Sequence, residues 1–119
     1  MEFALSDDQK MMQESINRTL ERVSPLERVR KAAGHEAFAA DVLNALVELG
    51  VTGILVPEEH GGLGLKLLDA ALTAETLGRH VAPVPFIASS VMAPIAIAGA
   101  GSDAQKKKYL PKLASGALI

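Results

Sequence analysis

The chain has 119 residues, the size of one ordinary domain, and 49% of them are hydrophobic, so a core can form without covalent cross-links. It has no cysteine, which excludes disulfides, cysteine-ligated zinc and thiol nucleophiles and agrees with a cytoplasmic location. A formal net charge of −2 argues against a nucleic-acid binder.

Two capped helices are expected at the start of the chain. Ser6-Asp7-Asp8-Gln9 has the spacing of a capping box, in which Ser6 and Gln9 each accept the other's backbone N–H. Behind it, apolar residues recur at helical spacing and predict a single buried stripe: Met12, Ile16, Leu20 and Val23. The segment Ser24-Pro25-Leu26-Glu27 predicts a second box, which opens a short helix that ends at Gly34.

Two further helices are expected on either side of a glycine-rich connection. The first spans about 36–49, is followed by Gly50 in the left-handed conformation, and points four apolar residues inward: Phe38, Val42, Leu46 and Leu49. The segment 53–57 is too short to predict a strand. The second helix spans about 66–78 and should bury Leu68, Ala71, Leu72 and Ala74.

Residues 86–98 predict a fifth helix that is apolar nearly all round, so we expect it to be central and buried. Pro94 should kink or split it, because proline lacks the N–H that a helix interior needs. The surrounding apolar tract, residues 81–100, is interrupted by prolines and serines, so we expect no membrane span.

A third capping box, Ser102-Asp103-Ala104-Gln105, opens a last helix through Tyr109, which Pro111 should end or bend. Almost nothing in the chain alternates with the period of two that marks a half-buried strand. The sequence therefore predicts an all-α fold: one domain, residues 1–119, built as a compact bundle of five to six helices.

The stretch VPEEHGGLGL, residues 56–65, is dense in glycine. A P-loop would need a second glycine five positions after Gly61, where Lys66 stands, and a dinucleotide fingerprint would need one at Leu67. Neither pattern is met. We instead expect a tight turn in which Gly61, Gly62 and Gly64 have positive φ or lie in close backbone contact.

Three sets of charged residues are candidates for chemistry. His60 follows two glutamates but lacks the spacing of a metal site, so we expect a solvent-facing loop and no metal. Glu75 has Arg79 at i+4 and is interpreted as half of an ion pair rather than a general base. The run 106–108, all lysine, is interpreted as a solvated helix face.

Ser89 and Ser90 lie within the apolar fifth helix and allow two interpretations. They either pack in the core with their hydroxyls bonded to the preceding turn, or line an apolar pocket for a chain-like ligand with small neighbours such as Ala88 and Ala93.

The order of these pieces resembles the N-terminal helical domain of the acyl-CoA dehydrogenase family. The matching stretches are SDDQKMMQESI, LVELGVTGILVPEEHGGLGL, AETLGRH and IAIAGAGSDAQKKKYLPKLASGALI. The resemblance covers essentially the whole chain and about the first third of a family member. Its most specific part is the pair VPEEHGGLGL and QKKKYLPKLASG, in this order and at this separation.

The resemblance implies FAD-dependent oxidation of an acyl-CoA thioester to trans-2-enoyl-CoA, usually with an electron-transfer flavoprotein as acceptor. It places the catalytic base and the flavin site in a middle β-domain and a C-terminal helical domain, so Glu58, Glu59 and Glu75 are not catalytic. It also implies that the N-terminal domain packs on those domains and forms one wall of the acyl pocket, by position at Phe86, Ser89, Ser90 and Ala93.

We expect this chain alone to bind no FAD and to be inactive. Because faces that meet the other domains should be apolar, we also expect self-association that buries the fifth helix or Phe86. The segment HVAPVPF is similar to members that act on bulky acyl groups, some of which are mixed assemblies, so the oligomer could be homo- or hetero-oligomeric. The alternative is a free-standing helical domain that binds a partner protein without catalysis.

Overall fold

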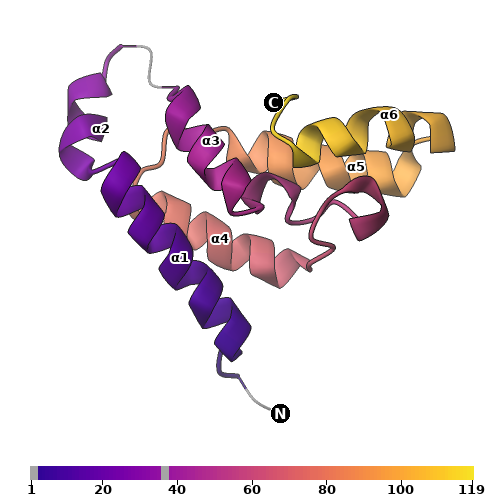
Figure 1. Cartoon of the computed structure of the whole chain (residues 1–119), viewed down its shortest axis with the longest axis horizontal. Helices are drawn as coiled ribbons and strands as arrows, with labels where there is room; N and C mark the ends of the chain where they lie inside the picture. The colour runs from indigo at the N-terminus through magenta and orange to yellow at the C-terminus, as the bar shows by residue number, and fades with distance from the viewer. Residues whose placement is uncertain (1–2, 36–37) are drawn as a thin grey trace.

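The computed structural model describes residues 3–35 and 38–119, and all the regular structure within them is helical (Figure 1). The six α-helices are α1 Asp7–Val23, α2 Leu26–Ala32, α3 Ala40–Glu48, α4 Leu67–Arg79, α5 Ala93–Ala100 and α6 Asp103–Ala114. Two 3₁₀ turns, η1 Val51–Gly53 and η2 Glu58–His60, join α3 to α4, and a π-helical turn, η3 Ile87–Met92, runs directly into α5. The all-α class predicted from the sequence is confirmed.

The first helix begins as its capping box predicts. The Ser6 hydroxyl accepts the Gln9 N–H at 3.1 Å, and the Gln9 side chain accepts the Ser6 N–H at 3.0 Å. Ile16 and Leu20, at most 1% exposed, face the core, as their spacing predicts. The box at Ser102 and Gln105 is also confirmed, with the same pair of bonds at the start of α6.

Helices α1 and α4 lie side by side (Figure 1), and we call their contact the α1–α4 junction; polar side chains join the two helices there. The Gln9 amide donates to Asp69 Oδ1 at 3.0 Å, and the Gln13 amide donates to the Leu72 carbonyl at 3.2 Å. Beyond the end of α4, His80 Nε2 lies 2.8 Å from Asn17 Oδ1. The junction is therefore held by hydrogen bonds as well as by apolar packing.

The buried apolar residues form two clusters. The main cluster gathers residues of α1, α3, the η1 turn, α4 and the start of the fifth helical segment: Ile16, Leu20, Val42, Leu46, Val51, Ile54, Ala70, Leu77 and Phe86. The second cluster joins α6 to the loop after η1 through Val56, Leu110 and Leu113. The expected single stripe of α1 thus becomes one wall of the main core.

The inward face of α4 differs from the predicted one. Leu68 is 59% exposed and Ala71 is exposed, whereas Ala70, Thr73 and Leu77 are buried. Thr73 can be buried because its hydroxyl contacts Met12 Sδ at 3.8 Å, and a polar group with a hydrogen-bond partner is tolerated in a core. Ala74, which was also predicted to face inward, packs against the main cluster, so the pattern of apolar residues predicted the inward face of α4 only in part.

The box predicted at Ser24 is wrong. Ser24 instead ends α1, with its N–H donating to the Leu20 carbonyl at 2.8 Å. Pro25 precedes the first residue of α2, and no side chain caps that helix. The fixed φ of proline favours a helix start, but the serine before it is already used by the preceding helix.

The third and last helices also end differently from prediction. The described part of α3 begins at Ala40, and the predicted first residue, Glu36, lies outside the described residues. Phe38 and Leu49 flank the helix and are 43% and 38% exposed, while Gly50 takes the left-handed conformation as predicted, with φ 77°. The last helix continues past Pro111 to Ala114, because Leu110 and Leu113 on either side of the proline are buried.

Candidate functional site

The candidate site is built on the helical segment that runs through η3 and α5. Residues 81–102 contain no Asp, Glu, Lys or Arg, so this part of the surface carries no formal charge. The α-helical ladder gives way to a π-helical turn just before Pro94, which fits a proline that cannot donate an N–H. Among the described residues, no helix combines the length and the apolarity that crossing a bilayer requires.

The segment is less buried than its composition predicts. Ile87, Met92 and Ile95, which we call the exposed stripe, are 53%, 63% and 51% exposed. Their spacings of five and three residues match one π turn and nearly one α turn, so they share one side of the segment. The prediction of a central, fully buried helix is wrong, because only the opposite side packs against the cores.

The four residues that the sequence places at the pocket wall lie mainly on that packed side. Phe86, Ser89 and Ser90 are 7%, 7% and 2% exposed, and Ala93 packs against the second core cluster. The Ser89 hydroxyl donates to the Pro85 carbonyl at 2.7 Å, which is the bond to the preceding turn that the first interpretation expects. Of the four, Phe86 lines the hollow described next.

An apolar hollow of about 290 Å³ lies between the end of α4 and the start of η3; we call it the α4 hollow. Its lining is Ala74, Leu77, Gly78, Val81, Ala82, Val84, Phe86 and Ile87. Ile87 belongs both to this lining and to the exposed stripe, so the two apolar surfaces are continuous. Such a surface can hold an uncharged, chain-like group and exclude water from it.

Val81 stands at the rim of the α4 hollow in an unusual backbone conformation. Its φ is +49°, a region that β-branched residues rarely adopt, and the residue is 57% exposed. The Val81 N–H donates to Gly78 O and the Ala82 N–H to Leu77 O, the bond pattern that usually ends a helix at glycine. Val81 was not predicted from the sequence, since its only signal is the absence of a glycine directly after α4.

The glycine-rich loop is a turn, as predicted. Gly61 and Gly64 have φ of 85° and 60°, and a Cβ atom at Gly62 would overlap the Val56 carbonyl. The N–H groups of Gly62, Leu63 and Gly64 all donate to backbone carbonyls of the preceding segment, at 2.9–3.2 Å. Because these donors are used, the loop offers no cradle for a phosphate group.

The charged candidates take structural positions. The loop around His60 faces solvent as predicted, since Glu58, Glu59 and Gly61 are exposed. The His60 side chain itself is only 14% exposed, and its Nε2 lies 3.6 Å from Glu59 Oε1. Glu75 and Arg79 form the predicted ion pair at 3.3 Å. Lys107 and Lys108 are exposed on α6, as the solvated-face interpretation expects. The described residues contain no group of three side chains able to hold a metal ion.

The fold and the site define a class: an all-α domain that presents an uncharged apolar helix face beside an apolar hollow. The family described as acyl-CoA dehydrogenase, N-terminal domain, matches residues 6–117. The chain therefore belongs to the acyl-CoA dehydrogenase family and corresponds to its N-terminal domain.

Similar proteins agree with this placement. Isobutyryl-CoA dehydrogenase, mitochondrial, of Dictyostelium discoideum is 36% identical over 113 residues, which are 93% of this chain and 27% of that protein. In the structure of butyryl-CoA dehydrogenase from Megasphaera elsdenii, the whole chain superposes on 32% of that chain, with a TM-score of 0.82 and 26% identity. A structure described for the electron transferring flavoprotein of Acidaminococcus fermentans superposes with a TM-score of 0.83 and 28% sequence identity. The superposition covers the whole of this chain and 32% of that chain. The chain thus spans about a third or less of the length of these relatives.

Proposed function

We propose that this chain serves an FAD-dependent acyl-CoA dehydrogenase, which converts an acyl-CoA thioester to the 2-enoyl-CoA, and that it forms one wall of the acyl pocket. The observation that carries the proposal is the uncharged exposed stripe that continues into the α4 hollow. An alkyl chain needs such a surface, since it forms no hydrogen bonds and gains by leaving water.

The residues divide into two roles in this proposal. The exposed stripe faces the acyl chain, because its side chains are more than half exposed in this domain. Phe86, Ser89, Ser90 and Ala93 shape the wall: Phe86 lines the hollow, and the Ser89 bond to Pro85 fixes the start of η3. The domain therefore positions substrate and excludes water, and it takes no part in proton transfer.

The flavin is assigned to the remaining domains of the parent protein. A dinucleotide needs donors for its diphosphate, and the glycine loop of the described chain has none to spare. The chemistry that FAD supplies when bound is hydride acceptance, and nothing in this chain is proposed to tune it. We likewise place the general base outside this chain, since Glu58, Glu59 and Glu75 are exposed and Glu75 pairs with Arg79.

The proposed partners follow from the same assignment. They are the acyl-CoA substrate, the remaining domains of the parent, an electron-transfer flavoprotein as acceptor, and further copies or a second subunit in a homo- or hetero-oligomer. The similarity to a chain of an electron transferring flavoprotein structure supports the acceptor. A cytoplasmic location is proposed from composition alone, and cell fractionation tests it.

The test uses the protein encoded by the whole reading frame and acyl-CoA-dependent reduction of a dye acceptor. Met92→Glu puts a charge on the stripe and should lower kcat/KM at least about tenfold, because a carboxylate beside an alkyl chain must be desolvated. Lys107→Glu, at an exposed position of α6, is the matched control and should change kcat/KM less than about twofold. Equal effects of the two variants on kcat/KM would contradict the proposal that the stripe lines the acyl pocket.

The alternative function, a helical domain that only binds a partner protein, predicts a different outcome. The reading frame would then stop after this domain, and the purified protein would reduce no dye with any acyl-CoA. An open frame that encodes a flavin-binding domain, together with a yellow purified protein, supports the dehydrogenase.

A further inference from the structure

The second helix is the least integrated element of the described fold. None of the residues of α2 is buried, and Leu26 at its start is 48% exposed. Figure 1 shows α2 at the edge of the molecule, beside the ends of α1 and α3. Since helices of this length gain stability mainly from tertiary packing, α2 depends on whatever few contacts attach it to its neighbours.

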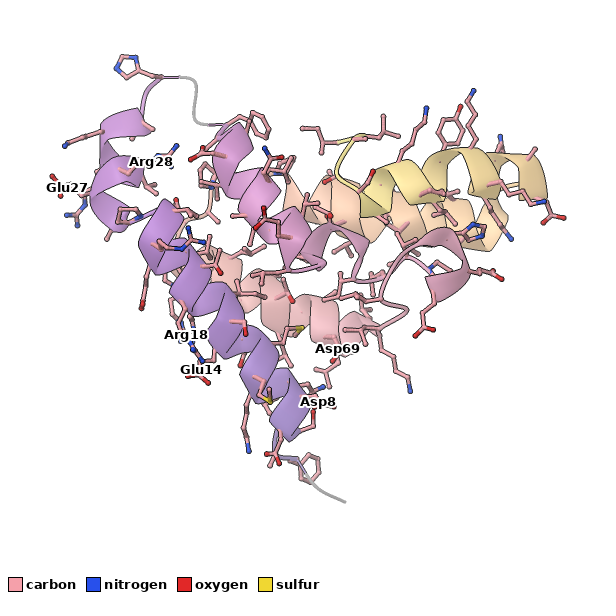
Figure 2. The ribbon with its side chains drawn as sticks, in the orientation of Figure 1. Asp8, Glu14, Arg18, Glu27, Arg28 and Asp69 are labelled. Atoms are coloured by element: carbon pink, nitrogen blue, oxygen red, sulfur yellow. The ribbon has the colours of Figure 1, made fainter. Side chains whose placement is uncertain are left out.

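One side chain makes the polar attachment. The Arg28 guanidinium donates to both carboxylate oxygens of Asp41, each at 2.8 Å, and to the Val23 carbonyl at 2.6 Å. It therefore joins α2 to the first turn of α3 and to the last turn of α1. Figure 2 shows Arg28 on the side of α2 that faces the other helices, with Glu27 on the opposite side. The two-oxygen geometry makes this a directional contact rather than a loose surface pair.

The space that α2 covers is incompletely packed. A hollow of about 440 Å³, the α2 hollow, is lined by Ser24, Arg28, Val29, Ala32, Phe38, Ala39, Ala40, Asp41 and Pro83. Ser24 is 1% exposed, and its hydroxyl has no hydrogen-bond partner among the described residues. A buried hydroxyl without a partner disfavours the closed arrangement, because it would gain hydrogen bonds to water if it were uncovered.

Both ends of α2 are built for bending. Ser24 makes the last hydrogen bond of the α1 ladder, and Pro25, which has no N–H, cannot continue it. After it, Gly34 has φ of 87° with open space where a side chain would stand. A rotation at these two points moves α2 as a unit without breaking its internal hydrogen bonds.

We propose that α2 is a flap over the α2 hollow and that the Arg28–Asp41 ion pair is its latch. Opening exposes the hydroxyl of Ser24 and the apolar lining around Phe38 and Pro83. Pro83 lies in the loop that leads into Phe86, and its carbonyl accepts the Ala39 N–H at 3.4 Å. The flap is therefore connected to the candidate site through that loop, and the inference goes beyond the proposed function without depending on it.

Hydrogen exchange measured by NMR on the 119-residue chain tests the flap through variants of opposite sign. Asp41→Asn loses the charge of the latch and should speed exchange of the amides from Val29 to Ala33 at least about threefold. Ser24→Ala removes the unpartnered hydroxyl and should slow the same amides. Exchange at Ile16 and Leu20 in the core should stay constant in both variants, because local opening leaves the core intact.

Glu27→Gln is the matched control, since it removes the pair between Glu27 and Lys31 at 3.3 Å within α2 and leaves the latch in place. It should change α2 exchange less than Asp41→Asn does. In the unmodified chain, raising salt from about 0.01 M to about 1 M shortens the Debye length from about 30 Å to about 3 Å and should speed α2 exchange. The flap is refuted if α2 and the core exchange at one common rate, if Ser24→Ala fails to slow α2, or if the control equals Asp41→Asn.

Discussion

The α1–α4 junction and the exposed stripe distribute polar and apolar side chains in opposite ways. At the junction, Thr73 and Thr76 are no more than 2% exposed, and the Gln13 amide reaches Thr76 Oγ1 at 3.3 Å. On the stripe, Met92 and Ile95 are more than half exposed, although no charged residue lies within the surrounding segment. Hydrophobicity therefore does not decide burial by itself: polar groups can be buried where partners satisfy them, and large apolar groups left outside together indicate a surface that contacts something else.

The largest expected difference between the two regions is in stability. Leu20→Ala, at a position with no exposure on the packed side of α1, should lower the free energy of unfolding by about 2–5 kcal/mol through lost burial and a residual cavity. Ile95→Ala removes a similar side chain from the exposed stripe and should cost less than about 1 kcal/mol. Urea denaturation measures both losses of unfolding free energy, provided that the slope of this free energy against urea concentration is the same in the variants and the unmodified chain. Similar losses for the two variants, at a concentration low enough to keep the chain monomeric, would mean that the stripe is packed within the domain.

Val81 allows a substitution that should stabilise the chain. Val81→Gly relieves the left-handed conformation, which costs an L-residue roughly 1–2 kcal/mol, but it increases the entropy of the unfolded chain. On balance, we expect the free energy of unfolding to rise by about 0.5–1 kcal/mol, as measured by thermal or urea denaturation. Ala82→Gly, at the next position and with ordinary φ, is the control and should lose a similar amount. A loss for Val81→Gly would show that the valine side chain contributes more at the α4 hollow than its backbone strain costs.

The sequence could predict local features that depend on neighbouring residues. Two capping boxes, the left-handed Gly50 and the three positions of the glycine turn all follow from short-range chemistry, and the structure confirms them. The family also followed from the order of these short motifs, and the match over residues 6–117 confirms it.

Tertiary contacts decided what the sequence could not. The register of α4 depends on threonines that are buried only because Met12 and a backbone carbonyl contact their hydroxyls. The last helix passes Pro111 because buried leucines on either side hold it. At the candidate site, the role in the wall of the acyl pocket stays a prediction for Phe86, Ser89, Ser90 and Ala93. The exposed stripe was missed because an apolar segment does not reveal which of its sides will find a partner within the domain.

Self-association should distinguish the stripe from the junction. Since exposed apolar residues that lie together favour association, we predict that the isolated chain forms a concentration-dependent dimer or larger species through the stripe. The double variant Met92→Lys and Ile95→Lys should shift it to a monomer in light scattering, because lysines on facing copies repel. Leu68→Lys, at a residue 59% exposed on α4, is the control and should leave the association unchanged. A monomeric unmodified chain at high concentration would contradict this prediction.

The smallest expected effect concerns pH at the α1–α4 junction, where Asp69 lies beside the N-terminal end of α1 (Figure 2). The pKa of Asp69 is lowered, first by the hydrogen bond from the Gln9 side chain and then by the Lys66 N–H, which donates to Oδ2 at 2.9 Å. Because the folded pKa lies below the unfolded value of about 3.9, the stabilisation is fully present above that value and is lost as pH falls through the folded pKa.

Asp69→Asn should therefore reduce the stability of the chain at neutral pH and flatten its decline below about pH 4, as followed by urea unfolding at a series of pH values. The stripe carries no carboxylate, so Ile95→Ala should leave the shape of that pH profile unchanged. Glu21→Gln, on the exposed side of α1, is the charge-matched control and should not reproduce the Asp69→Asn profile. If it does, the acid sensitivity reflects net charge rather than the hydrogen bonds of the junction, and the contrast between the two regions then rests on packing alone.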